Sequence, residues 1–350
     1  MVSIDQFEKM FVSVFDPKKD ESILLLYDVP INTILDNDLW RERRELVEEW
    51  FEKCSLLKET YGFTVEKKSY NATGEHNAPL HDNILDFCKK KNIVIALTEF
   101  SATSSLVNLV QHNKESLRSA SMPLAEQRMM DTVFSMDYTH VRHYSHKLKN
   151  MLTGAESALI IFNTGDILSI DLRNRIGGAD DGDCRRPGSF INLPSGEGFI
   201  APYEAVNNER EQFGKSRTQG ILPFYHQNKL VKGTVKQNMI DDFTCESTIK
   251  QELISFFDCY KNRRNIGELG IGCNPQAKVT GNFIEDEKVG VHIAYGTSRH
   301  LGGKVISDLH HDLVYSKGCR VSAETVTLQY QDRPDILIVK DGTLQYNLLQ

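Results

Sequence analysis

The stretch NIVIALTEFSAT, residues 92–103, decides how the first half of the chain folds. Its apolar run is continuous rather than alternating, which is typical of a strand buried on both faces of a parallel sheet. The run ESILLLYDVP at 21–30 has the same character. Further strands are predicted at 63–70 and 117–125, and helices over 39–62, 78–91, 105–117 and 139–155. Strands and helices alternate, which predicts a doubly wound parallel sheet with helices on both faces.

Composition and missing motifs exclude several functions. Neither the glycine-rich dinucleotide motif nor the P-loop motif follows any of these strands, so nucleotide binding has no support. The net charge of −7 argues against nucleic-acid binding, because phosphate contacts need a basic surface. No uncharged apolar run approaches the roughly 18 residues that a membrane-spanning helix needs. Cysteines are scattered and form no CxxC pair, which predicts reduced thiols and a cytoplasmic protein.

The second half of the chain has a different pattern, with few helices. Antiparallel strands are predicted within 156–172, 220–243 and 325–347, a helix over 247–265, and a loop over the Gly- and Asp-rich run 175–188. The predicted fold class is therefore an α/β N-terminal domain with a parallel sheet, followed by a mainly antiparallel, β-rich α+β C-terminal domain that binds metal. We place the boundary between residues 1–155 and 156–350.

The metal-site prediction rests on GELGIGCNPQAKVTGNFIEDEKVGVHIAYGTSRHLGGKVISDLHHDLV, residues 267–314. Its candidate ligands are Glu268, Glu287, His292, His310 and Asp312. The two-residue period of a strand puts His310 and Asp312 on one face and turns His311 to the other. A charged residue such as Glu268 inside an apolar strand is costly unless it is paired or metal-bound.

A further carboxylate, Glu197, lies in SFINLPSGEGFIAPYE at 189–204, where Ser-Gly predicts a tight turn. Taken alone, Glu197 could lie in a surface turn, or its side chain could point into a cleft. Carboxylates with imidazoles and no thiolate suit Zn²⁺, Co²⁺, Mn²⁺ or Fe²⁺, and so many carboxylates allow two ions with one bridging ligand. Any single residue, such as His292, could instead be a hydrogen-bonded core residue, so the whole set carries the prediction.

A resemblance to a known family appears at these same residues. NLPSGEGFIAP (192–202), IGELGIGCNP (266–275), DEKVGVHIAYG (286–296) and HHD (310–312) resemble the motifs of the M29 family of metallo-aminopeptidases, the aminopeptidase T and S group. The resemblance covers roughly 93–315 and includes LTEFSAT, SMPLAEQRM and ALIIFNTGD. It implies an α/β domain, a β-rich domain with two metal ions, and a dimer.

Carried over to this chain, the resemblance implies Glu197 and His292 on one ion, Glu268 bridging, and Glu287 with Asp312 on the second. His310 would be a ligand or a stabiliser of the tetrahedral intermediate. Arg299 stands where larger members carry a catalytic Tyr. It could bind an oxyanion or a carboxylate, or form a plain salt bridge. The catalytic Tyr of the larger members is therefore absent from this position.

Dioxygenases that open the ring of 2,5-dihydroxypyridine resemble the same fold, with one Fe²⁺ held by two His and one Asp. His310 and Asp312 match that pattern, but Glu268 stands where the first iron histidine would be. The retained carboxylates favour a cytoplasmic metal-dependent hydrolase of a small peptide or amide, with Glu268 as bridging ligand and base. The alternatives are a mononuclear iron dioxygenase and a catalytically inactive binding protein.

Overall fold

The computed structural model describes residues 2–206 and 208–350, and the chain divides into two compact units. Within these ranges, the first unit runs to residue 142 and includes 180–195, while the second consists of 143–179 and 196–350. The sequence predicted a single boundary at 155/156, whereas the compact units interleave along the chain. That boundary between folding domains stays a prediction.

The first unit contains a five-stranded, all-parallel sheet in the order β2-β1-β3-β4-β8, as predicted. Its strands are β1 (Ser22–Val29), β2 (Thr64–Asn71), β3 (Ile93–Thr98), β4 (Arg118–Pro123) and β8 (Phe190–Asn192). Every residue of β3 is buried, which accounts for its continuous apolar run. The short strand β8 comes from much later in the chain and joins the edge beside β4.

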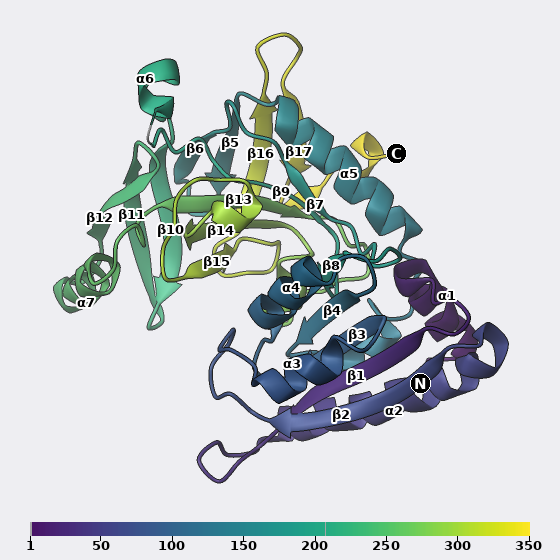
Figure 1. Ribbon diagram of the computed structural model, residues 1–350. Coiled ribbons are helices and arrows are strands. Elements are labelled where there is room, and N and C mark those ends of the chain that lie inside the picture. The colour runs from purple at the N-terminus through teal and green to yellow at the C-terminus, as the bar shows by residue number, and fades with distance from the viewer. Residues whose placement is uncertain (1, 207) are drawn as a thin grey trace. The chain divides into compact units, whose positions relative to one another are not determined.

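Helices cover both faces of this parallel sheet, with α2 on one side and α3 and α4 on the other (Figure 1). The helices are α1 (Ile4–Phe15), α2 (Asp38–Tyr61), α3 (Asp82–Cys88), α4 (Thr103–His112) and the 3₁₀ turn η1 (Gln127–Asp131). Helix α2 ends at Gly62, whose φ of 73° suits glycine. Helix α3 is shorter than the predicted 78–91; Pro79 disfavours helical backbone at residue 78, and the chain leaves the helix after Cys88.

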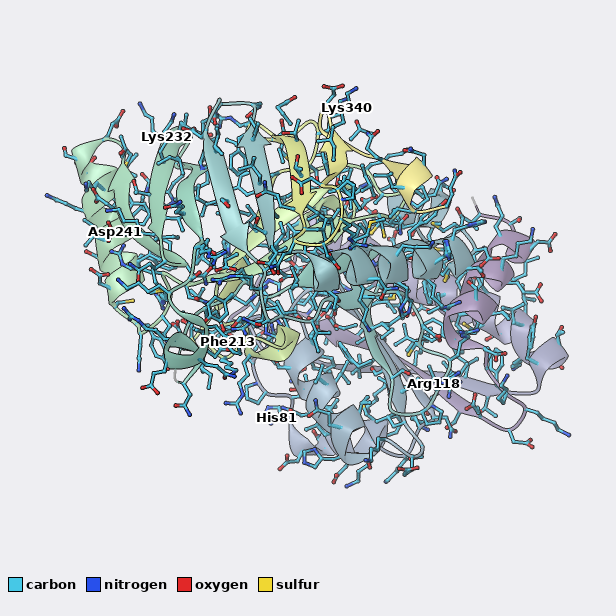
Figure 2. All side chains as sticks on the ribbon, turned by 90° about the horizontal axis from the view of Figure 1, so that it is seen from above. His81, Arg118, Phe213, Lys232, Asp241 and Lys340 are labelled. Carbon is cyan, nitrogen blue, oxygen red and sulfur yellow. The ribbon has the colours of Figure 1, made fainter. Side chains whose placement is uncertain are left out.

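A buried ion pair joins one end of this sheet to the chain entering it. Arg118, labelled in Figure 2, opens β4 and is almost fully buried. Its two terminal nitrogens each donate to one carboxylate oxygen of Glu21 at 2.7 Å. Burial alone would raise the pKa of Glu21, but the guanidinium holds it below its ordinary value. This bidentate pair links the residue just before β1 to the first residue of β4, and β3 lies between these two strands in the sheet.

The second unit contains two sheets. One is eight-stranded and antiparallel, in the order β12-β11-β10-β6-β5-β16-β17-β18. Its strands are β5 (Ser157–Phe162), β6 (Ile167–Asp171), β10 (Gln219–His226), β11 (Lys229–Lys236), β12 (Met239–Thr244), β16 (Ala323–Gln329), β17 (Ile336–Lys340) and β18 (Thr343–Leu344). The other has five strands, β15 (His310–Val314), β14 (Val291–Gly296), β13 (Ile266–Gly272), β9 (Glu197–Ile200) and β7 (Gly178–Asp180). The expected antiparallel, β-rich architecture is confirmed.

One hydrophobic core lies between these two sheets, and it includes Ile160 and Val326 of the larger sheet and Leu269 and Ile293 of the smaller one. The second unit also holds most of α5 (Thr139–Gly154), together with α6 (Glu209–Phe213), α7 (Ser247–Asp258), α8 (Phe283–Asp286), η2 (Arg299–Leu301) and η3 (Tyr346–Leu348). Helix α7 ends earlier than the predicted 265, because turns follow it and Asn262 adopts a left-handed φ of 68°.

Three further sequence expectations concern a loop, the cysteines and membrane-spanning helices. Strand β7 lies inside the stretch 175–188 that the sequence predicted as a loop, so that prediction was wrong for those residues. All seven cysteines carry free thiols. Within residues 2–206 and 208–350, the helices lack the combination of length and apolar character that crossing a membrane requires.

Candidate metal centre

One face of the five-stranded sheet carries most of the predicted ligands. In the register of its strands, Gly272 pairs with Glu197, Gly270 with His292, Ala294 with Glu268 and Asp312, and Gly296 with His310. Paired residues share a face of the sheet, as do residues two apart in one strand. The polar side chains therefore project to one side, while the intervening Leu269 and Ile293 enter the core on the other.

Glycine between these ligands makes the cluster sterically feasible. A Cβ atom at Gly270 would lie only 1.9 Å from Nε2 of His292, the residue opposite it. A Cβ atom at Gly272 would lie 2.4 Å from the backbone oxygen of Glu287. The run IGELGIG thus supplies one carboxylate, and its glycines leave room for His292 and for the backbone of Glu287. These glycines are needed because neighbouring atoms approach closely, not because the chain turns.

Three predicted ligands converge closely. Glu268, His292 and Asp312 each offer one ligand atom, and these atoms all lie within 4.8 Å of one another. Glu268 and His292 are almost fully buried. His311 turns away, as strand periodicity predicted, and its ring packs against that of Tyr295 with the centroids 5.1 Å apart at an angle of 42°.

His310 joins this group through its Nε2 atom, which lies 2.9 Å from Oε2 of Glu268 and 3.4 Å from Oδ1 of Asp312. Its Nδ1 atom lies 2.8 Å from the backbone oxygen of Thr297. A carbonyl can only accept, so Nδ1 carries the proton and the ring orientation is held by the backbone. The Nε2 atom is therefore free to act as a ligand or, when protonated, as a donor to the carboxylates.

Glu197 and Glu287 meet at a residue that the sequence did not single out, Lys288. Its Nζ atom lies 2.8 Å from Oε1 of Glu197 and 3.0 Å from Oε1 of Glu287, and only 1% of its side chain is exposed. Glu197 opens β9 rather than lying in a turn as predicted. Its other oxygen, Oε2, lies 3.2 Å from Nε2 of His292. The sequence feature that could have indicated Lys288 is its position in the DEKVG motif, directly after the predicted ligand Glu287.

The pKa values in the cluster reflect its excess of negative charge. Burial alone would lower the pKa of His292, but the carboxylates of Glu268 and Glu197 raise it to about 10. The pKa of His310 is likewise well above its ordinary value, because Asp312 and Glu268 outweigh burial. Burial raises the pKa of Glu287, and the nearby Glu197 and Asp312 carboxylates add to that effect.

The residues present fit a bound divalent cation. Two buried atoms, Nδ1 of His292 and Oε2 of Glu197, have no hydrogen-bond partner among the described residues. Four carboxylates face a single ammonium in this cluster, and buried carboxylates are stable only when cations or hydrogen bonds compensate them. Glu268, His292 and Asp312 offer the oxygen and imidazole ligands that borderline metal ions prefer.

Arg299 lies apart from these contacts in the structure. It opens η2, its side chain is exposed, and among the described residues that side chain makes no hydrogen bond or ion pair. Its role as an oxyanion or carboxylate partner stays a prediction. The next residue, His300, has its ring 4.6 Å from the ring of His310 at an angle of 82°. Like Lys288, His300 lies next to the predicted ligands although the sequence analysis did not indicate it.

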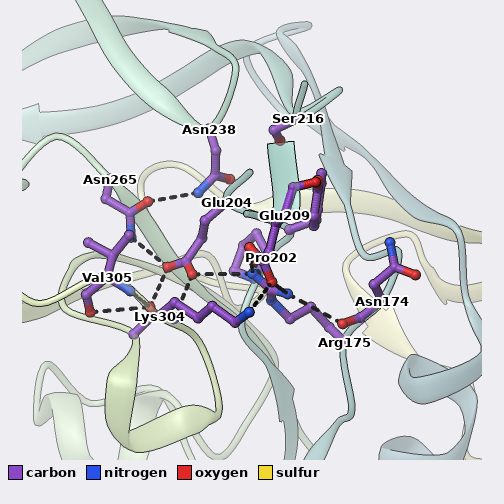
Figure 3. A network of polar contacts seen from close by, with 12 residues as sticks. Asn174, Arg175, Pro202, Glu204, Glu209, Ser216, Asn238, Asn265, Lys304 and Val305 are labelled. Carbon is purple, nitrogen blue, oxygen red and sulfur yellow. Dashed lines mark hydrogen bonds and ion pairs between the residues drawn. The ribbon is translucent and has the colours of Figure 1, made fainter. Parts of the chain in front are cut away.

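A polar network centred on Glu204 holds the segment that carries η2 (Figure 3). Glu204 accepts hydrogen bonds from the Ser298 hydroxyl and from the backbone N–H of Lys304 at 2.7 Å. These two contacts lie on either side of η2. Arg175 binds Glu204 at 3.3 Å and Glu209 at 2.7 Å, so the network is also joined to α6. It therefore positions η2, and with it His300, relative to the sheet.

The chain therefore combines an α/β unit that contains a parallel sheet with a β-rich unit that carries a cluster of carboxylates and imidazoles. No protein-family model matches the sequence, and no curated protein matches it in sequence. Two solved structures share the fold across almost the whole chain. The two fold relations that the motifs predicted are thereby confirmed.

The first is the structure of 2,5-dihydroxypyridine dioxygenase from Pseudomonas putida KT2440. It has a TM-score of 0.65 and 15% identity, and the match covers 98% of each chain. The second is wild-type AmpT, an M29 aminopeptidase, from Thermus thermophilus, with a TM-score of 0.61, 12% identity, and coverage of 97% of this chain and 99% of that one. At such identities the likeness establishes the fold and leaves the reaction to the residues of this chain.

Proposed function

We propose that this chain is a metal-dependent hydrolase of an amide or peptide bond. The observation that carries the proposal is the convergence of Glu268, His292 and Asp312, whose ligand atoms lie within 4.8 Å of one another beside the Glu197–Lys288–Glu287 ion pairs. The likeness of fold to an M29 aminopeptidase supports the same direction.

In this proposal, some residues of the cluster would bind the metal ion and another would transfer a proton. When bound, a divalent ion supplies Lewis acidity, which polarises a carbonyl and makes a water molecule more acidic. Glu268, His292 and Asp312 would hold that ion. His310 is more exposed than Glu268 or His292, and its Nε2 atom hydrogen-bonds to Glu268, so this atom can take up and return a proton during hydrolysis. The Thr297 carbonyl keeps its ring in place for that transfer.

A hydrolysis assay tests the proposal directly. Chain freed of metal by chelator would be supplied with Co²⁺, Zn²⁺ or Mn²⁺ and a panel of aminoacyl amides and short peptides. We expect turnover that requires metal and that Glu268→Gln abolishes, while Glu252→Gln, a change at an exposed helical carboxylate, keeps it. Metal-independent turnover, or turnover unchanged in Glu268→Gln, would contradict the proposal.

A ring-opening dioxygenase is the second candidate. His310 and Asp312 share one face of β15, 3.4 Å apart, with Glu268 beside them, and the 2,5-dihydroxypyridine dioxygenase has a similar fold. The Glu268 carboxylate, which stands where the first iron histidine would be, favours the hydrolase. Oxygen consumption with Fe²⁺ and a dihydroxypyridine, and no amide hydrolysis, would select the dioxygenase. Absence of both activities with every metal would select a binding protein.

A further inference from the structure

Lys288 is a buried cation placed among the predicted metal ligands. It lies two residues after the end of α8, and its ammonium lies 2.8 Å from an oxygen of Glu197 and 3.0 Å from an oxygen of Glu287. These two carboxylates come from different parts of the sequence, one opening β9 and the other ending α8. The ammonium therefore lies at the point where a cation shared by both carboxylates would lie.

The family resemblance implies two metal ions, whereas the described residues offer one closely converging ligand set. Within residues 2–206 and 208–350, a single set of three or more His, Cys, Asp or Glu residues has ligand atoms within 4.8 Å of one another, namely Glu268, His292 and Asp312. Glu197 and Glu287 stand outside that set. Glu287 would have to leave Lys288 in order to bind a second ion together with Asp312.

An ammonium and a divalent ion cannot share this place. Lysine has three N–H donors and no lone pair when charged, so Lys288 satisfies carboxylate oxygens but cannot ligate a metal. Two positive charges a few ångströms apart in a buried site repel each other by several kcal/mol or more. In addition, the backbone oxygen of Lys288 accepts a hydrogen bond from the N–H of Asn274 at 3.0 Å, which ties this residue to the end of β13.

We propose that Lys288 takes the place of a second metal ion, so that the chain binds one divalent ion, held by Glu268, His292 and Asp312. This inference rests on the metal centre of the proposed function and specifies its composition. Lys288 acts as a positioning residue, because its charge holds Glu197 and Glu287 in the cluster without presenting Lewis acidity. The site then differs from the two-metal arrangement that its motifs imply.

Metal stoichiometry tests this inference without any measurement of activity. Chelator-treated chain would be equilibrated by dialysis against Co²⁺, and bound metal per chain measured by mass spectrometry of the elements. The unmodified chain should bind one ion. Lys288→Met, which removes the charge but keeps the length, should bind two, because Glu197 and Glu287 become free to ligate. Lys304→Met is the matched control; its ammonium pairs with Glu209 at 2.9 Å, and this variant should still bind one ion.

Two ions in the unmodified chain, or one ion in a folded Lys288→Met variant, would overturn the inference, as would a chain that binds none. If Lys288→Met does not fold, Glu287→Gln still decides: it should keep one ion, whereas loss of that ion would place Glu287 among its ligands and contradict the inference. The proposed function fails separately. One bound ion without hydrolysis would refute the hydrolase alone, and hydrolysis with two bound ions would refute the single-ion site alone.

Discussion

Two buried charged clusters lie in the second unit, and they are built on opposite principles. The network of Figure 3 sets the cations Arg175 and Lys304 against the carboxylates Glu204 and Glu209, with both carboxylates engaged. In the part of the chain that the structure describes, the cluster on the five-stranded sheet sets four carboxylates against the ammonium of Lys288 and leaves two buried atoms without a hydrogen bond.

The difference separates structure from function. A charge-balanced network has no need of any outside group, and its hydrogen bonds reach both sides of η2, which is what a structural support requires. An unbalanced buried cluster is costly by itself and becomes stable only when it binds a cation or protons. On this view the first cluster should control stability and the second should control metal binding, and each can be perturbed separately.

The largest expected effect is on the balanced network. Arg175→Met should lower the free energy of unfolding by about 3–5 kcal/mol, because it leaves Glu204 and Glu209 buried without their main partner. Chemical denaturation measures this change. Metal content per chain should stay the same in the folded fraction. Lys229→Met, which breaks an exposed pair with Glu246, serves as the control and should change stability little.

In the unbalanced cluster, substitutions should change metal affinity more than they change stability. Glu268→Gln should weaken metal binding by about 100-fold, since even partners that merely orient ligands contribute 10- to 100-fold. Isothermal titration with Zn²⁺ or Co²⁺ gives the affinity. The metal-free variant should be less stable than the metal-free parent at neutral pH, because the protonated His292 and His310 lose the Glu268 carboxylate as a partner. Equal metal affinity in variant and parent would remove Glu268 from the site.

Gly270→Ala tests the space that the ligand face requires. Its new Cβ atom would lie 1.9 Å from Nε2 of His292, so the imidazole must move, at a cost of about 1–3 kcal/mol and with weaker metal binding. Gly233→Ala in β11 is the matched change, because its Cβ atom would meet neighbours only at 3.4 Å or beyond. Thermal unfolding with and without metal compares the two variants. Similar behaviour of both would show that His292 is not fixed as described.

The smallest effect concerns protons. Glu268 and Glu197 raise the pKa of His292 from its ordinary 6.5 to about 10 in the metal-free chain, despite burial. A raised pKa contributes stability that is fully present below pH 6.5 and is lost as pH rises through 10. At pH 8 metal must displace that proton, so binding should release about one proton or more per ion. Titration calorimetry in buffers of different ionisation enthalpy counts it; no release would contradict the raised pKa.

Most of the fold was predictable because its signals are local. The continuous apolar run of β3 and the helical spacing of α2 identified the parallel sheet, and strand periodicity placed His310 and Asp312 on one face. Errors appeared where local patterns are weak. The short strand β7 lies in a Gly- and Asp-rich stretch that has no strand signal and depends on its partner β9.

The candidate site was predictable as a set of residues but not as a geometry. The register that puts Gly270 opposite His292 is a property of paired strands, and a single sequence does not contain it. Lys288 was not predicted as part of the site, because a lysine next to a glutamate usually lies on a solvated surface. Only the return of β9 beside β13 brings Glu197 to its ammonium.

We expect the unbalanced cluster to bind a divalent cation. Elemental analysis of chain purified without chelator, beside its Glu268→Gln variant, measures this directly. We predict one divalent ion per unmodified chain and a variant with little or none. A well-folded unmodified chain that carries no metal, and whose unfolding temperature does not rise when Zn²⁺, Co²⁺, Mn²⁺ or Fe²⁺ is added, would contradict it.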